Sequence, residues 1–139
     1  MTPKTPASDL AAAMTGESVG GVSLTSGTNL FFRRLHPDPL TMAVYLIDSG
    51  GEAPSAYVHG TTAEATFRAR VVSTVYGPPG EDGFELGESL ARGVHGFFHQ
   101  QAISGYIAVY ALEGGPSHNV DVATQRHVFT SSFEAVYNA

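Results

Sequence analysis

Cysteine is absent from this sequence, and lysine occurs only once, as Lys4. Without a thiol, neither disulfide bonds nor thiolate metal sites are available to the chain. No apolar run approaches the roughly 20 residues that a membrane-spanning helix needs. No long apolar segment follows the first residues, as it would in a secretion signal. We therefore expect a protein that is made in a cytoplasm and does not contact membranes.

Positive charge is scarce as well. The 13 acidic and 7 basic residues give a net charge of −6 at pH 7. Proteins that wrap nucleic acid neutralise phosphates with clustered lysine and arginine. Here only Arg33–Arg34 and the Arg68/Arg70 pair lie close together in the sequence. Because an acidic chain repels a polyanion, the composition argues against a protein that wraps DNA or RNA.

The length of 139 residues is typical of one domain with its own core. Residues 1–8 hold two prolines and small polar side chains, so we expect a flexible arm there and a single domain over residues 9–139. Asp9, or Ser8 before it, suits the N-cap of a short helix over Leu10–Met14, a run rich in alanine.

Hydrophobic patterning predicts a series of strands separated by turns. The nearly continuous apolar run Thr41–Asp48 is typical of a strand buried on both faces. Alternation in the third strand places Arg68 and Arg70 on one face and Val71 on the other. The predicted strands are Asn29–Leu35, Thr41–Asp48, Thr66–Tyr76, Tyr106–Leu112 and a C-terminal arm, Val120–Asn138, kinked near Thr130–Ser132, with turns at His36–Leu40 and Gly114–Asn119.

One long helix is predicted, over Phe84–Gln101. Its apolar stripe consists of Leu86, Leu90, Val94, Phe97 and Phe98. Glu88 and Arg92 form an i,i+4 pair on the polar side, and three glycines would let the helix approach a sheet closely. Runs of strands with one central helix predict an α+β fold. We expect a mostly antiparallel sheet with this helix packed on one face and the short N-terminal helix beside it.

The segment Glu52–Ala65 has low hydrophobicity and no periodicity, so it is predicted to be a long loop. Loops of this length in compact domains are usually functional or flexible. We expect it to contact other proteins, with Tyr57 as its anchor, because tyrosine offers apolar area and a hydrogen bond.

His95 and His99 are the sharpest chemical feature, because a spacing of four on a helix places both imidazoles on one face. Zinc sites use this spacing, but they need a third ligand, and the glutamate of the His-Glu-x-x-His motif is missing. We interpret the two residues as surface histidines. No metal is expected.

No other group of residues predicts catalysis. Asp48, Asp121 and His118 could be combined into an acid–base site, but the aspartates suit turns equally well. No serine lies in a Gly-x-Ser-x-Gly motif, and no glycine-rich segment carries the lysine of a phosphate-binding loop. We therefore expect neither an enzyme nor a cofactor.

Several segments together resemble a known family. They are the short N-terminal helix, Asn29–Phe32, Pro37–Leu40, the buried run Ala43–Gly51, the arginine-bearing strand Phe67–Tyr76, the long helix, and a late strand from Asp121 through Arg126 to Phe133. The pattern extends from Asp9 to Tyr137. It is similar to that of the tail terminator, or tail-completion, proteins of long-tailed bacteriophages, which are often labelled minor capsid proteins.

The resemblance implies a structural virion protein that forms a hexameric ring. Such a ring caps the finished tail tube, stops polymerisation of the tube protein and provides the surface on which the head docks, while DNA passes through its lumen without specific binding. The implied partners are other copies of the chain, the tail tube protein and a head-completion or neck protein. The implied location is the tail or neck of a virion assembled in the host cytoplasm. The residues expected at subunit or tube interfaces are Arg68, Arg70, Tyr57, His59 and Arg126.

Two alternatives stay open. Another neck, head-completion or tail tube protein would share most of these features, although a tube subunit would stack on copies of itself. In a different class, a small ligand- or metal-binding α+β domain would use His95, His99 and the acidic turns. Metal analysis of the purified protein separates that class from the structural ones.

Overall fold

The computed structural model describes residues 4–32, 42–51, 55–59, 62–78, 80, 82–99 and 101–138. The expected turn at His36–Leu40 and the pair Arg33–Arg34 lie outside these residues. The described chain forms two helices and nine strands: α1 (Pro6–Met14), β1 (Ser18–Val19), β2 (Val22–Ser23), β3 (Leu30–Phe31), β4 (Ala43–Gly51), β5 (Ser55–His59), β6 (Thr62–Tyr76), α2 (Gly83–Phe98), β7 (Ala108–Ala111), β8 (Ser117–Asp121) and β9 (Arg126–Asn138).

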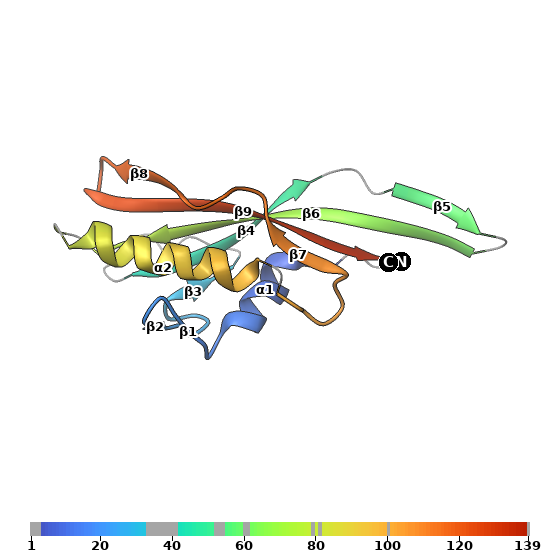
Figure 1. Ribbon diagram of the computed structural model, residues 1–139, viewed down its shortest axis with the longest axis horizontal. Helices are drawn as coiled ribbons and strands as arrows, with labels where there is room; N and C mark the ends of the chain where they lie inside the picture. Colours follow the sequence, from blue (N-terminus) through green and yellow to red (C-terminus); the bar gives the residue numbers. More distant parts are fainter. Residues whose placement is uncertain are drawn as a thin grey trace.

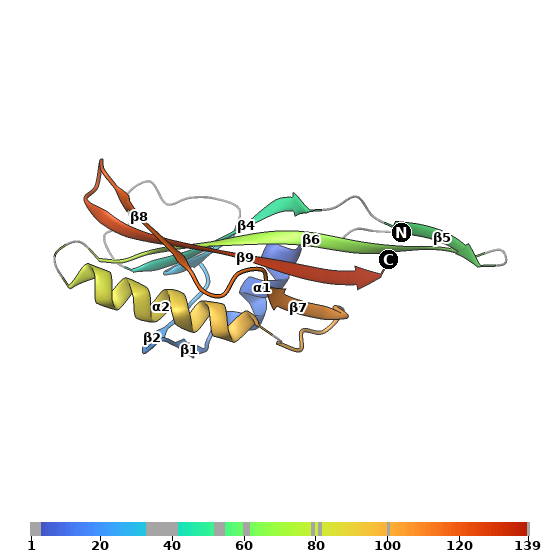
Figure 2. The same ribbon diagram turned by 45° about the horizontal axis from the view of Figure 1, so that its top comes forward.

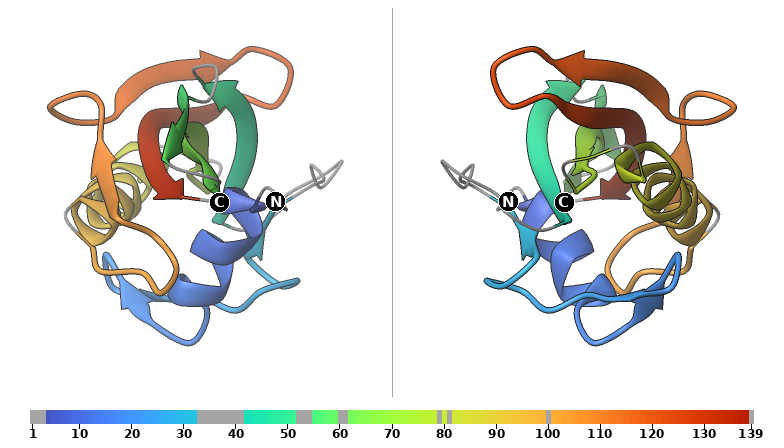
Figure 3. Two further views of the ribbon diagram at one scale, coloured as in Figure 1. Left: turned by 90° about the vertical axis from the view of Figure 1, so that its right-hand side faces the viewer. Right: turned by 90° about the vertical axis from the view of Figure 1, so that its left-hand side faces the viewer.

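Seven strands form one sheet in the order β3-β4-β6-β9-β7, with β5 also paired to β6 and β8 also paired to β9 (Figure 1). Every pair in it is antiparallel except β3 with β4. Seen end-on, the sheet is strongly curled (Figure 3). The predicted α+β fold with a mostly antiparallel sheet is confirmed. The sequence patterns gave no sign of the separate β1–β2 hairpin.

The long strands β6 and β9 form the centre of the sheet. They pair without interruption from Thr66 opposite Asn138 to Tyr76 opposite Val128. The predicted kink near Thr130–Ser132 is therefore wrong. The apolar pattern fails there because a serine, Ser131, takes a buried position. The predicted turn at 114–119 is also partly wrong, because β8 begins within it.

The predicted loop Glu52–Ala65 is wrong, because most of it is a β-hairpin. β5 pairs with the start of β6, from Ser55 opposite Thr66 to His59 opposite Thr62. The neighbours of β6 end sooner: its pairing with β9 stops at Thr66, and its pairing with β4 stops at Ala69. The hairpin therefore continues as a two-stranded ribbon beyond the rest of the sheet (Figures 1 and 2).

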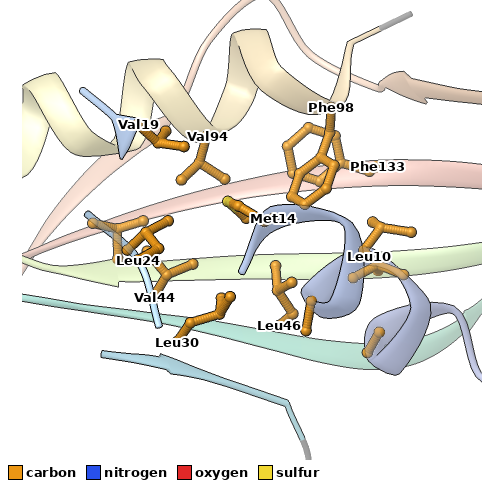
Figure 4. Packing of buried hydrophobic residues seen from close by; sticks show 14 of the residues in the cluster. Leu10, Met14, Val19, Leu24, Leu30, Val44, Leu46, Val94, Phe98 and Phe133 are labelled. Atoms are coloured by element: carbon orange, nitrogen blue, oxygen red, sulfur yellow. The ribbon is translucent and has the colours of Figure 1, made fainter. Parts of the chain in front are cut away.

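The core lies between one face of the sheet and the two helices (Figure 4). From α2, the side chains of Leu90, Val94 and Phe98 are completely buried in it. Leu86, which the predicted stripe included, is 47% exposed. The buried positions in the first turns of α2 are instead Gly83 and Gly87. Among the described residues, neither helix is long and apolar enough to cross a membrane.

The short helix α1 begins at Pro6, earlier than predicted, so residues 6–8 belong to it rather than to an arm. Proline suits the first position of a helix, where an N–H has no intrahelical partner. Asp9 is not the N-cap. The backbone N–H of Ala7 instead donates to Oδ1 of Asp48, at 2.9 Å. A carboxylate from β4 thus stabilises the N-terminus of α1.

Candidate interaction surface

The face of the sheet turned away from the core carries the two arginines that the sequence singled out. Along β6, Val71 and Val75 enter the core, whereas Arg68 and Arg70 are exposed on the opposite face. The predicted alternation of this strand is confirmed. The two guanidinium groups differ, however, in their surroundings.

Arg68 is part of a three-residue network across β6, β9 and β7. Its Nη1 lies 3.2 Å from Oε1 of Glu134 and 3.4 Å from the hydroxyl oxygen of Tyr110. The Tyr110 hydroxyl in turn donates to Oε2 of Glu134. The hydrogen bond to Glu134 raises the pKa of Arg68 and is also the main reason that the pKa of Tyr110 is raised. Much of the charge of Arg68 is therefore neutralised within the chain.

Arg70 lies beside this network as the cross-strand neighbour of Glu134. It is exposed, and none of the carboxylates that the structure describes forms a salt bridge with it. Of the two arginines, Arg70 is the one whose charge is available to another molecule.

Arg126, which was expected at an interface, is only 4% exposed. Its Nε donates to the backbone oxygen of Gly77 at 2.7 Å, and its guanidinium carbon lies 5.8 Å from the centre of the Tyr76 ring. It therefore ties the start of β9 to the end of β6. Its burial in the single chain argues against the predicted interface role, which stays a prediction.

Tyr57 and His59 both lie in β5, opposite Glu64 and Thr62 of β6. The structure does not describe their side chains. Their place in the chain nevertheless matters, because β5 is part of the projecting ribbon (Figure 2).

His95 and His99 lie near each other, with ring centres 6.4 Å apart, and both are used to hold the segment around β7. Nε2 of His95 donates to the carbonyl of Glu113 at 2.8 Å, and Nδ1 of His99 accepts from the N–H of Ala111 at 3.3 Å. Over the described part of the chain, no three histidine, aspartate or glutamate side chains are grouped as a metal site. The expectation that no metal binds there stays a prediction.

A second histidine pair was not found from the sequence. Nε2 of His118 and Nδ1 of His127 are 2.8 Å apart, so one donates and the other accepts. The ring of Phe84 meets both imidazoles edge-on. Asp121, considered with His118 for acid–base chemistry, instead accepts the N–H of Ala123 in the β8–β9 turn. The contacts of Phe84 with the two histidines join α2 to the β8–β9 hairpin.

The fold has a counterpart in an assembled particle. One chain in the solved structure of the virion of a native gene transfer agent (GTA) particle matches with a TM-score of 0.54 at 19% sequence identity. The match covers 81% of this chain and 81% of that virion chain. No protein-family model and no curated protein matches the sequence. The likeness to the virion chain is thus one of fold, and it extends over most of both chains.

Two hollows border the large sheet. One, of about 240 Å³, lies where the start of α1 meets β4 and β6, and its lining includes Lys4, Asp48, Phe67 and Tyr137. The other, of about 510 Å³, runs along β7 and is lined by residues 99, 101–102 and 107–110, among them His99 and Ile107. Ile107, which lines this hollow, is 62% exposed.

Proposed function

We propose that the protein is a structural component of a virion, and within it the tail terminator. In this role, copies of the chain close into a hexameric ring on the end of the tail tube, stop its growth and present a docking surface to the head. The observation that carries the proposal is the fold shared with a chain of a GTA virion over 81% of both chains. The sequence resemblance to tail terminators supports the more specific role.

The charge of the chain suits this function. DNA that crosses the ring must slide rather than adhere, and a chain with a net charge of −6 offers few phosphate contacts. Arg68, one of the few exposed cations, is already neutralised by Glu134. We propose that DNA passes the ring without specific binding.

A non-enzymatic role also agrees with the side chains that the sequence analysis considered for chemistry. His95 and His99 contact the backbone around β7, and Asp48 accepts a hydrogen bond from the start of α1. Each of these groups therefore has a structural role in holding elements together.

Deletion of the gene from the genome that encodes the particle tests the proposal. We expect filled heads without tails, and tail tubes of uncontrolled length, because nothing stops polymerisation. Complementation with the intact gene should restore joined particles. Joined particles with tails of normal length in the deletion strain would contradict the terminator role.

The alternative within the virion is a tail tube subunit, and purification separates the two. A terminator forms single rings that do not stack, whereas a tube subunit polymerises into tubes at high concentration. Electron microscopy of the concentrated protein distinguishes these outcomes directly.

A further inference from the structure

The turn between β8 and β9 presents an apolar side chain to solvent at one end of the large sheet (Figure 1). Val122 in this turn is 80% exposed, more than any other large apolar side chain that the structure describes. Val120, at the end of β8, is 43% exposed. The turn residues 122–125 carry no charged side chain. The tip of the hairpin can therefore enter an apolar surface without taking a charge out of water.

Hydrogen bonds within the chain fix the shape of this turn. Oδ1 of Asp121 accepts the N–H of Ala123 at 3.1 Å, and the carbonyl of Asp121 accepts the N–H of Gln125 at 2.7 Å. The side-chain amide of Gln125 donates to the carbonyl of Val122 at 3.3 Å. A segment that is already ordered loses less conformational freedom when it binds. The turn thus holds Val122 in a fixed position while its side chain stays in solvent.

The hollow along β7 has a lining that suits an apolar side chain. Its volume of about 510 Å³ lies within the range of about 300–1,000 Å³ that is usual for ligand sites. The lining includes Ala102, Ile107 and Ala108 and holds no carboxylate, lysine or arginine. Ile107 is, after Val122, the most exposed large apolar side chain that the structure describes. A side chain that enters the hollow needs no backbone hydrogen bond from β7.

Within one copy, the turn is too far away to fill this hollow. The turn adjoins the start of β9, where Asp121 pairs with Arg126, whereas Ala108 of β7 pairs with Val136 near the end of β9. Positions 126 and 136 are ten residues apart in this strand, and at about 3.3 Å per residue this is roughly 30 Å. A contact between the turn and the hollow therefore joins two molecules.

We propose that the β8–β9 turn of one copy inserts Val122 into the hollow along β7 of the next copy. The inference rests on the proposed ring and names a contact that closes it. The two surfaces differ and lie apart on one chain, so their contact is head-to-tail. Such contacts repeat from copy to copy and close into a ring when the rotation between copies allows. Burial of Val122 against Ile107 removes apolar area of both side chains from water, which favours association.

Disulfide trapping between two variants tests this contact, because the natural chain has no cysteine. A disulfide forms only where two Cα atoms come within about 4.4–6.8 Å of each other. One variant carries Val122→Cys in the turn. The other carries Gln101→Cys, Ile107→Cys or Ala108→Cys in the lining of the hollow. Ser23→Cys, at an exposed position of β2 that belongs to neither surface, is the matched control.

Under mild oxidation of mixed variants, at least one combination of turn and hollow should form several-fold more cross-linked heterodimer than Val122→Cys mixed with Ser23→Cys. Equal yields in all combinations, while native mass spectrometry still shows rings, would overturn this contact and leave the ring standing. Predominant cross-links between two Val122→Cys chains would also overturn it. Failure of the protein to form rings alone or in particles would reject the proposed function together with the contact.

Discussion

A few polar side chains hold α1 against the sheet. The Tyr106 hydroxyl donates to Oδ2 of Asp9 at 2.6 Å, and the backbone N–H of Lys4 donates to the Tyr137 hydroxyl at 3.1 Å. Asp48 accepts the N–H of Ala7 from the other side. Because these partners come from β4, β9 and the segment before β7, α1 is tied to parts of the chain far away in the sequence.

Tyr106→Phe should lower the free energy of unfolding by about 1–2 kcal/mol at neutral pH, because it removes a hydrogen bond to a carboxylate. Burial, followed by the hydrogen bond to Asp9, raises the pKa of Tyr106. Above the ordinary tyrosine pKa of about 10, the unfolded chain loses this proton while the folded chain keeps it. The stabilisation is therefore fully present below about pH 10 and is lost as the pH rises further.

Urea denaturation of both proteins at about pH 8 and about pH 11 measures this effect. The stability gap between the natural protein and Tyr106→Phe should narrow at the higher pH, because the variant has no proton to release at this position. A gap that stays constant across the two pH values would show that Tyr106 ionises equally in both states.

Leu90 and Leu86 form a matched pair on α2, since one is completely buried and the other is 47% exposed. Leu90→Ala should cost about 2–5 kcal/mol, because it removes core contacts and leaves a cavity. Leu86→Ala should stay within about 0.5 kcal/mol of the natural protein. Denaturant titration of the two variants measures both values. Equal losses would mean that α2 presents a different face to the sheet.

At the scale of the element, α2 packs closely because glycines replace side chains where it crosses other segments. A Cβ at Gly93 would lie 2.8 Å from the backbone N of Gly20, and one at Gly87 would lie 2.8 Å from the ring of Phe129. A Cβ at Gly96 would meet nothing within 4 Å. Gly87 and Gly93 therefore serve close packing, and Gly96 does not.

These contacts predict opposite effects for the same substitution. Gly96→Ala should stabilise the protein by about 0.5–1 kcal/mol, because alanine is the better helix former and finds open space. Gly93→Ala should destabilise it by about 1–3 kcal/mol, because the β1–β2 turn must move away. Thermal unfolding of Gly93→Ala and Gly96→Ala measures whether each substitution raises or lowers stability. Higher stability in both variants would contradict the close packing around Gly93.

The ribbon of β5 and β6 should open more easily than the rest of the sheet. In the free protein, amides of Thr62–Ala65 should exchange faster than those of Val71–Tyr76, because the latter pair with β4 and β9 on both sides. In assembled particles the ribbon should become protected. Hydrogen exchange measures both states, and equal protection of the two segments in free protein would contradict this account.

The sequence predicted the elements that contribute apolar side chains to the core. The apolar patterns of β4 and α2 are strong because many of their side chains are buried in the core. The order of strands and helices along the chain then indicates the fold class. The ribbon was missed because its residues show no apolar alternation, and because it continues beyond the pairing of β6 with β4 and β9. In β9, buried Ser131 opposite Ser73 interrupted the apolar pattern of a strand that is continuous in the structure.

The candidate surface was only partly predictable for a similar reason. Alternation along one strand placed Arg68 and Arg70 on one face, which needs only local information. The partners of Arg68, Glu134 and Tyr110, are 66 and 42 residues away, and only the pairing of three strands brings them together. The burial of Arg126 was not predicted, because a single arginine in a strand gives no sign that Gly77 and Tyr76 lie against it.

At the scale of the whole molecule, one elongated sheet carries the helices on one face, and the β5–β6 ribbon projects beyond its other strands (Figures 1 and 2). The face of the sheet opposite the helices carries the exposed Arg70. The likeness to a chain of a GTA virion is one of fold.

The most direct test of the central claim is a cryo-electron microscopy reconstruction of the particle that contains this protein. We expect a single hexameric ring of the chain at the head-proximal end of the tail tube, in contact with both the tube protein and the neck. Copies of the chain repeated along the whole tube, or a location inside the head shell, would contradict the account.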